Sequence, residues 1–190
     1  MSKTQIVSGG ITDGTIVTAD IADDAVTAAK TNANITMVNQ WRLNASFTQS
    51  AGQSDITSNW ELVDTNSYSS IGSDMTQSSG IFTFPSTGIY HIIYRNQGRA
   101  EGAARTRLGG RIKVTTDNSN YSTASLAFTS ATGHLYQFCT FQNIILDVTN
   151  TTNVKVKFTS EADPSSGSAF FDNETGLTYN SATFIRLGDT

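Results

Sequence analysis

Few residues of this 190-residue sequence have the type and spacing that catalysis requires. His91 and His134 are the only histidines, and they lie far apart in the sequence. His91 falls within the apolar run 89–94, a position more typical of a packed or interface residue than of a general base. The sequence contains no G-x-S-x-G nucleophile motif and no Walker phosphate loop, and Gly109-Gly110 predicts a β-bulge. We therefore expect a protein that is not an enzyme.

The carboxylates and the single cysteine provide little further indication of a catalytic or metal site. Asp163, Asp172 and Glu174 lie in one polar region, where two carboxylates could hydrolyse a glycoside or bind calcium, but the calcium-loop pattern is not met. Cys139 is the only cysteine, which excludes an intrachain disulfide and a zinc-finger site. We expect no catalytic residue, no metal and no cofactor. The alternative is a depolymerase-type enzyme whose site forms between subunits.

One segment of this acidic chain is basic. The net charge is −4, yet residues 95–113 contain six cations against Glu101 alone. We expect this charge to be solvated loop charge or to form ion pairs between subunits. The alternative is a patch of Arg99, Arg105, Arg107 and Arg111 that contacts an acidic partner surface. No nucleic-acid partner is expected, because the segment lacks interleaved aromatic residues and the whole chain is acidic.

Residues 1–36 differ from the rest of the chain. An apolar residue recurs every five positions, and residues 11–20 and 21–30 form an imperfect duplication. This period fits neither a helix nor a strand, and the intervening Gly and Asp residues favour turns. We predict an extended N-terminal arm that anchors the protein, either around a threefold axis or in a groove of another protein. Its anchoring residues are Ile6, Ile11, Ile16, Ile21 and Val26. A disordered tail with a helical stretch at 22–30 is the alternative.

From residue 37 the pattern is that of β-strands. Apolar runs alternate with gaps rich in Ser, Thr, Asn and Gly, which predicts about eight to ten antiparallel strands and no helix. The predicted strands are 38–47, 60–63, 81–84, 88–96, 108–116, 125–129, 135–148, 154–159 and 182–187. This pattern is typical of a sandwich or jelly roll.

Two of these strands are apolar on both faces. In the run 89–94, Tyr90 and Tyr94 alternate with Ile89 and Ile93, and the run 135–148 repeats the pattern. A strand of a single sandwich buries only one face, so a second apolar face predicts contact with another subunit.

The segment 82–94 resembles the strand-turn-strand signature of the tumour necrosis factor-like family, which includes the globular head of complement. Phe82, Gly88, Tyr90, Ile92 and Tyr94 occupy the positions of that signature. The segment 182–188 is similar to the family's last strand, which lies near the trimer axis. The resemblance implies an antiparallel jelly roll over residues 37–190 that assembles as a homotrimer. Its interface and core residues would be Phe82, Tyr90, Ile92, Tyr94, Phe138, Phe141 and Phe184.

No signal peptide or membrane-spanning segment is evident in the sequence, so no membrane association is expected. The arm resembles the N-terminal stretches of fibre and virion surface proteins of tailed bacteriophages. We therefore expect a virion protein assembled in the host cytoplasm, which decorates the capsid as a trimeric cement or surface protein. Its partners would be the major capsid protein or a tail protein. A short tail fibre that recognises a host glycan through loops 66–79 and 164–173 is the alternative.

Overall fold

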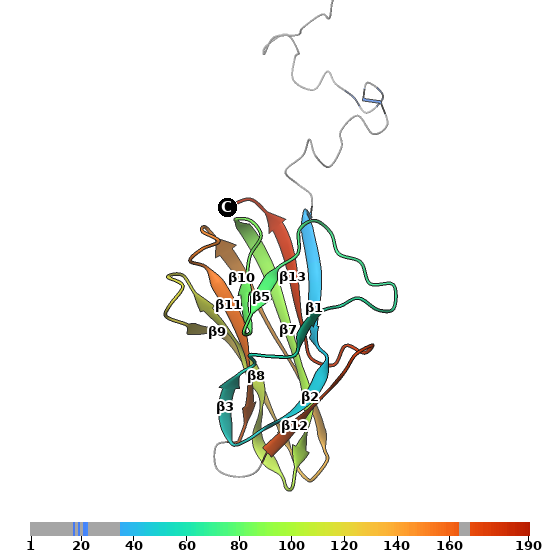
Figure 1. Cartoon of the computed structure of the whole chain (residues 1–190), viewed down its shortest axis with the longest axis vertical. Helices are drawn as coiled ribbons and strands as arrows, with labels where there is room; N and C mark the ends of the chain where they lie inside the picture. Colours follow the sequence, from blue (N-terminus) through green and yellow to red (C-terminus); the bar gives the residue numbers. More distant parts are fainter. Residues whose placement is uncertain (1–16, 18, 20, 23–34, 164–167) are drawn as a thin grey trace, which may run out of the picture. The chain divides into compact units, whose positions relative to one another are not determined.

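The computed structural model describes residues 17, 19, 21, 22, 35–163 and 168–190. By its internal contacts the chain divides between Asn34 and Ile35, and Ile35–Thr190 forms a sandwich of two antiparallel β-sheets (Figure 1). The described residues of this unit contain no helix. The prediction of an all-β antiparallel fold is confirmed.

Sheet A has seven strands, in the order β2-β12-β7-β13-β1-β4, with β10 also paired to β7. Sheet B has six, in the order β5-β6-β11-β8-β9, with β3 also paired to β11. The strands of sheet A are β1 (Met37–Leu43), β2 (Ala45–Gln49), β4 (Trp60–Leu62), β7 (Gly88–Glu101), β10 (Gln137–Val148), β12 (Ser168–Glu174) and β13 (Ser181–Gly188). Those of sheet B are β3 (Gly52–Asp55), β5 (Thr76–Ser78), β6 (Ile81–Thr83), β8 (Arg105–Thr115), β9 (Ser122–Ala131) and β11 (Lys155–Ala162).

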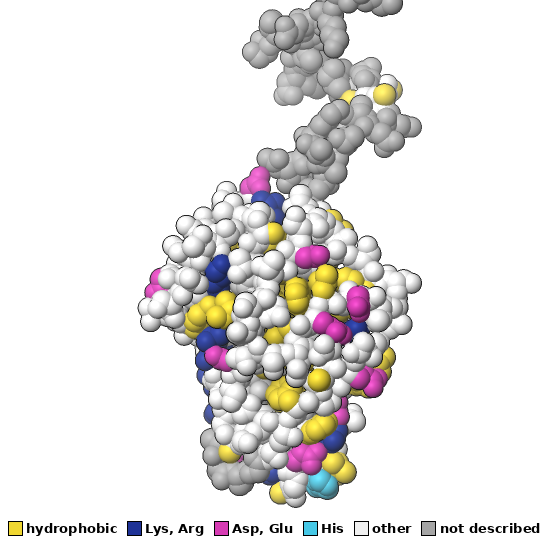
Figure 2. Space-filling model, viewed as in Figure 1, with side chains coloured by type: hydrophobic (Ala, Val, Ile, Leu, Met, Phe, Trp, Pro, Cys, Tyr) yellow, Lys and Arg dark blue, Asp and Glu magenta, His cyan; other side chains and the backbone are white. Residues whose placement is uncertain are grey.

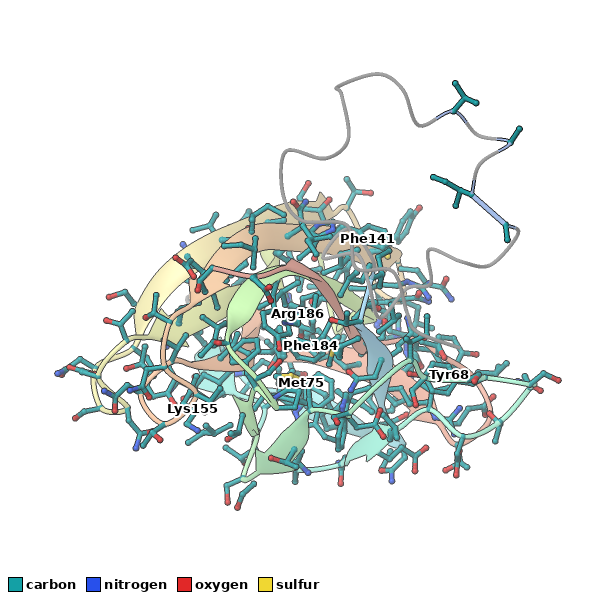
Figure 3. All side chains as sticks on the ribbon, turned by 90° about the horizontal axis from the view of Figure 1, so that it is seen from above. Tyr68, Met75, Phe141, Lys155, Phe184 and Arg186 are labelled. Carbon is teal, nitrogen blue, oxygen red and sulfur yellow. The ribbon has the colours of Figure 1, made fainter. Side chains whose placement is uncertain are left out.

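Aromatic side chains fill the space between the sheets. The ring of Phe158 on β11 lies 4.8 Å from that of Tyr94, 5.4 Å from that of Phe82 and 5.5 Å from that of Trp60, measured between centroids. Phe184 of the last strand joins the same cluster, and Figure 3 shows it inside the sandwich. Such ring pairs add to the free energy gained by burying apolar area.

The segment 82–94 folds as its pattern predicts. Gly88 begins β7 with a φ of 142°, a backbone conformation that residues other than glycine rarely adopt. The Tyr90 side chain two residues later is fully buried, and its hydroxyl donates a hydrogen bond to the Ser86 carbonyl at 2.9 Å. Gly88 and Tyr90 thus fix the turn and the face of β7 that enters the core.

Three strands were not predicted from the sequence. β3 and β5 are short and polar, and β12 follows a turn-rich segment, so none gives the apolar alternation that marks a strand. Each forms because its backbone pairs with a neighbouring strand, as β3 does with β11. The predicted bulge at Gly109-Gly110 is also wrong, since both pair in regular register with β9 and β11. A Cβ atom on Gly110 would lie 3.0 Å from the Tyr94 ring, so this glycine permits close packing.

Candidate self-association surface on sheet A

The outer face of sheet A carries a row of mostly apolar side chains across four strands, with His91 as its one polar member. Ile145 of β10 lies opposite His91 of β7, which lies opposite Ile185 of β13. Ile185 lies opposite Val38 of β1, and Val38 forms an isolated bridge with Ile71. Directly opposite side chains on neighbouring strands are close enough to form a continuous surface. We call these five residues the sheet A row.

Apolar residues beside the row widen this surface. Phe141 precedes Ile145 on the same face of β10, and their exposed fractions are 60% and 62%. Ile89 and Ile93 flank His91 on β7 and are half-buried. Large apolar side chains grouped in this way typically mark an interaction site. Burying such side chains in an interface would contribute about 1.5 to 3 kcal/mol each.

Polar structure borders the row at one end. The Arg42 side chain is fully buried on the same face, where its Nε donates to Glu61 Oε1 at 2.7 Å and its Nη2 to Asp64 Oδ1 at 3.0 Å. Burial raises the pKa of the Glu61 carboxyl, but hydrogen bonds from Asn44 and Arg42 outweigh this effect and hold the pKa below its ordinary value. The Arg42 cluster therefore remains charged and forms part of a polar rim.

The structure separates the seven residues predicted for interface and core. Phe141 alone lies on the exposed face. The other six are buried within the subunit, namely Phe82, Tyr90, Ile92, Tyr94, Phe138 and Phe184. Sequence analysis missed Ile185, Val38 and Ile71 of the row. Alternation along 182–188 could have indicated Ile185, but only the strand pairing places the other two beside it.

Two of the four predicted basic contact residues lie together on the outer face of sheet B. Arg111 donates to Glu161 Oε2 from Nε at 2.9 Å and from Nη2 at 2.8 Å, and Arg107 is bonded to Oε1 of the same carboxylate. The Glu161 side chain is fully buried beneath them. Both guanidinium groups also lie over the Phe128 ring. Glu161 was not predicted, because it is remote in sequence from the basic segment.

The other two basic residues lie elsewhere. Arg99 forms ion pairs with Glu101 and Asp172 and lies over the Phe170 ring on sheet A. Arg105 is buried and donates to backbone carbonyl groups, including that of Ala104 at 2.9 Å. The basic segment therefore does not form one continuous patch. Figure 2 shows Lys and Arg side chains along the side of the molecule where sheet B lies.

Of the three acidic residues considered for catalysis or calcium binding, Asp163 and Asp172 are bonded to other groups of the chain. Asp172 and Glu174 line a pocket of about 420 Å³ with Tyr179, but Asp172 is ion-paired with Arg99. Asp163 accepts a hydrogen bond from the Thr106 backbone amide at 3.1 Å. Among the described residues, no group of three or more His, Cys, Asp or Glu side chains could hold a metal ion.

His134 is a turn residue, and most of the predicted anchoring residues are not described. The Gly102 amide donates to Nδ1 of His134 at 3.0 Å, so His134 belongs to a turn beside sheet A. Of the five predicted anchoring residues of the arm, only Ile21 is described, and its side chain is exposed. Ile6, Ile11, Ile16 and Val26 lie outside the described residues. Within the described part of the chain, no helix is long and apolar enough to cross a membrane.

The comparisons with known proteins define the fold. Neither the protein-family models nor the curated proteins gave a match. Among solved structures, the Eiger TNF of S. frugiperda has a TM-score of 0.59 at 12% identity, over 83% of this chain and 96% of that one. Murine APRIL at pH 5.0 has a TM-score of 0.58 at 10% identity, over 80% of this chain and 98% of that one. The chain thus has a TNF-like jelly-roll fold. At these identities the likeness shows the fold alone.

Proposed function

We propose that the chain is a non-enzymatic, homotrimeric structural protein of a tailed-bacteriophage virion surface. The observation that carries the proposal is the sheet A row together with the neighbouring Phe141. In a single subunit, large apolar side chains of this surface are exposed to water. Self-association removes them from water, and a TNF-like fold favours a trimer. The virion setting rests on the resemblance of the arm to those of phage surface proteins. Within the virion we favour capsid decoration, since an arm with an apolar residue at every fifth position suits a groove between capsid subunits.

The mass of the full chain in solution tests the assembly. Sedimentation equilibrium should give about three times the chain mass of 20.4 kDa. A monomer at all accessible concentrations would overturn the proposal.

Quantitative mass spectrometry of purified virions tests the setting. Hundreds of copies for each particle would support capsid decoration, whereas a handful of trimers would indicate the tail. Absence from the particle would contradict the virion role. A polysaccharide-release assay, with Glu174→Gln as the matched variant, addresses the depolymerase alternative. Release that depends on Glu174 would contradict the non-enzymatic assignment.

A further inference from the structure

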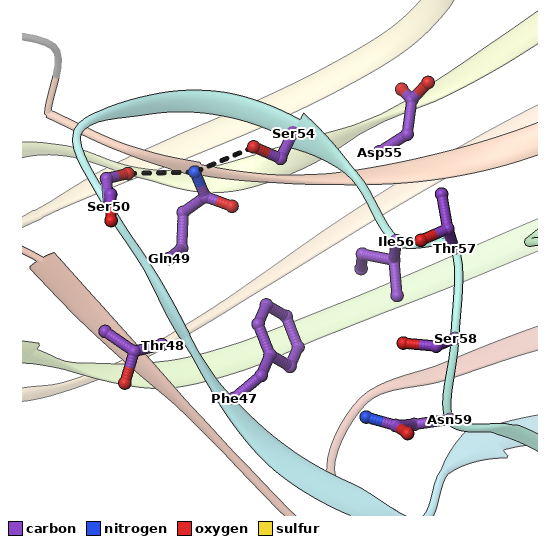
Figure 4. Close-up of a pocket in the computed structure, with 10 residues that line it drawn as sticks. All are labelled: Phe47, Thr48, Gln49, Ser50, Ser54, Asp55, Ile56, Thr57, Ser58 and Asn59. Atoms are coloured by element: carbon purple, nitrogen blue, oxygen red, sulfur yellow. Dashed lines mark hydrogen bonds between the residues drawn. The ribbon is translucent and has the colours of Figure 1, made fainter.

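A pocket of about 290 Å³ opens between the turn that joins β2 to β3 and the segment 55–59 (Figure 4). This volume is near the lower end of the range for small-molecule sites. Phe47 and Ile56 supply the apolar part of the lining. The polar residues of the lining include Thr48, Ser58 and Asn59.

The segment 55–59 is held firmly against the sandwich. The Ile56 amide donates to the Phe158 carbonyl at 2.9 Å, and the Trp60 indole donates to the Ile56 carbonyl at 3.0 Å. At the other end, the Asn44 amide donates to the Asn59 carbonyl at 2.9 Å. The backbone of this wall is therefore positioned before a ligand arrives, which reduces the entropy cost of binding.

The opposite wall is equally constrained. The Gln49 side chain is buried, donates to Ser54 Oγ at 3.2 Å and accepts from Ser160 Oγ at 2.8 Å. The Phe47 ring stacks in parallel on Phe171, with centroids 4.9 Å apart. These contacts hold the aromatic ring in the lining.

Several polar groups of the pocket have no partner. Within the described part of the chain, the side chains of Thr57, Ser58 and Asn59 make no hydrogen bond, in contrast to Gln49 on the other wall. The one carboxylate in the lining, that of Asp55, is bound by two lysines of sheet B, Lys157 at 2.6 Å and Lys113 at 3.5 Å. The groups free to meet a ligand are thus neutral hydroxyls and an amide.

We propose that this pocket binds a neutral saccharide of one or two rings. Hydroxyl and amide groups both donate and accept hydrogen bonds, as sugar hydroxyls require. The half-buried Phe47 ring offers apolar surface to the C–H face of a sugar ring. The site goes beyond the proposed assembly role and does not depend on it. It also differs from loop 66–79 and from the described residues of loop 164–173, none of which lines this pocket.

NMR with the full-length protein tests this proposal. Methyl glycosides of glucose, galactose, mannose and N-acetylglucosamine are each titrated to about 10 mM, a range that detects weak sugar binding. At least one should shift the amide resonances of 47–59 in a saturable way. Asn59→Gly should weaken that binding at least about threefold, because glycine tolerates the φ of 66° while the amide group is lost.

Asn118→Gly is the matched control. Asn118 also has a positive φ, 57°, but lies in a turn of sheet B away from the pocket lining, so its replacement should leave binding unchanged. The proposal is overturned if no neutral glycoside shifts 47–59, if glucuronate alone does so, or if the two variants weaken binding equally. Sedimentation of the same samples reports trimer formation separately, so failure of the two proposals can be distinguished.

Discussion

Tyr94 and Phe141 lie on paired strands of sheet A but face opposite sides of it. Phe141 is directly opposite Arg95, the residue after Tyr94, so the pleat sends the two rings in opposite directions. The Tyr94 side chain is fully buried and its hydroxyl donates to the Thr159 carbonyl, whereas Phe141 is 60% exposed. Burial also raises the pKa of Tyr94, although Asn96 donates a hydrogen bond to its hydroxyl. Tyr94 therefore stabilises the core of the subunit, whereas Phe141 is exposed and can contribute to an interface.

If the chain forms the proposed trimer, replacing Phe141 by Asp should dissociate it without unfolding the subunit. A carboxylate buried at an apolar interface carries a large desolvation cost, while in the separated subunit it would meet water. We expect sedimentation to give the mass of one chain, with an unchanged circular dichroism spectrum. A variant that remains fully trimeric would remove the sheet A row from the interface.

Leu126→Asp is the control for that experiment. Leu126 is a comparably exposed apolar residue, at 52%, but it lies on β9 of sheet B. The Leu126 variant should stay trimeric, because its side chain lies on the outer face of sheet B, opposite Arg111, and not on the proposed contact face. Dissociation of both variants would mean that any added charge disrupts assembly.

Phe158→Ala should lower the free energy of unfolding by about 3 to 5 kcal/mol, the usual cost of deleting a buried aromatic ring. Phe158 contacts the rings of Tyr94, Phe82 and Trp60, so the cavity is lined by rigid groups that cannot easily refill it. Chemical denaturation measures the change. Leu126→Ala, at an exposed position, should change stability by less than about 0.5 kcal/mol.

The Arg107, Arg111 and Glu161 cluster should respond non-additively to substitution. Either arginine alone can neutralise Glu161, so each Arg→Met variant should cost only about 1 kcal/mol. The double variant leaves a buried carboxylate without a partner and should cost about 3 to 5 kcal/mol. A double-mutant cycle by chemical denaturation measures the coupling. Adding Glu161→Met should restore much of the loss, and simple additivity would contradict the shared role.

Asp117 should make the stability of the sheet B turn depend on pH. Asn120 donates to its carboxylate from side chain and backbone, Thr115 and Ser119 add further hydrogen bonds, and together these lower the pKa of Asp117. The resulting stability is fully present above the unfolded pKa of about 3.9 and is lost as the pH falls through the lower folded value.

Asp117→Asn tests this dependence in denaturation series between about pH 7 and pH 2. The variant should be less stable than the parent chain near neutral pH. This difference should shrink on acidification, as the parent carboxylate becomes protonated. Parallel pH profiles would contradict the assignment.

Much of the fold could be predicted from local pattern. The positions of Phe82, Gly88 and Tyr90 combine a turn requirement with alternation, and both act within a few residues. β12 was missed because its pairing with β2 and β7 depends on distant segments. Local sequence holds little information about such partners.

The candidate surface was harder to predict. Alternation along 89–94 separates two apolar faces of the strand but does not indicate which face packs against sheet B. From the sequence alone, Tyr90 and Ile93 are therefore equally good candidates for the core. Pairing in three dimensions decides the matter and gathers Val38, Ile185 and Ile145 into one row. The same limit applies to Arg107, whose carboxylate partner lies on β11, far along the chain.

On sheet B each of two carboxylates is shared by two cations, Glu161 by a pair of arginines and Asp55 by a pair of lysines. This sharing leaves an excess of positive charge on the side of the sandwich opposite the apolar row. An assembly that hides sheet A would turn this charge outward in every copy. A neighbouring surface would then contact a positively charged outer face, although the chain as a whole carries a net charge of −4.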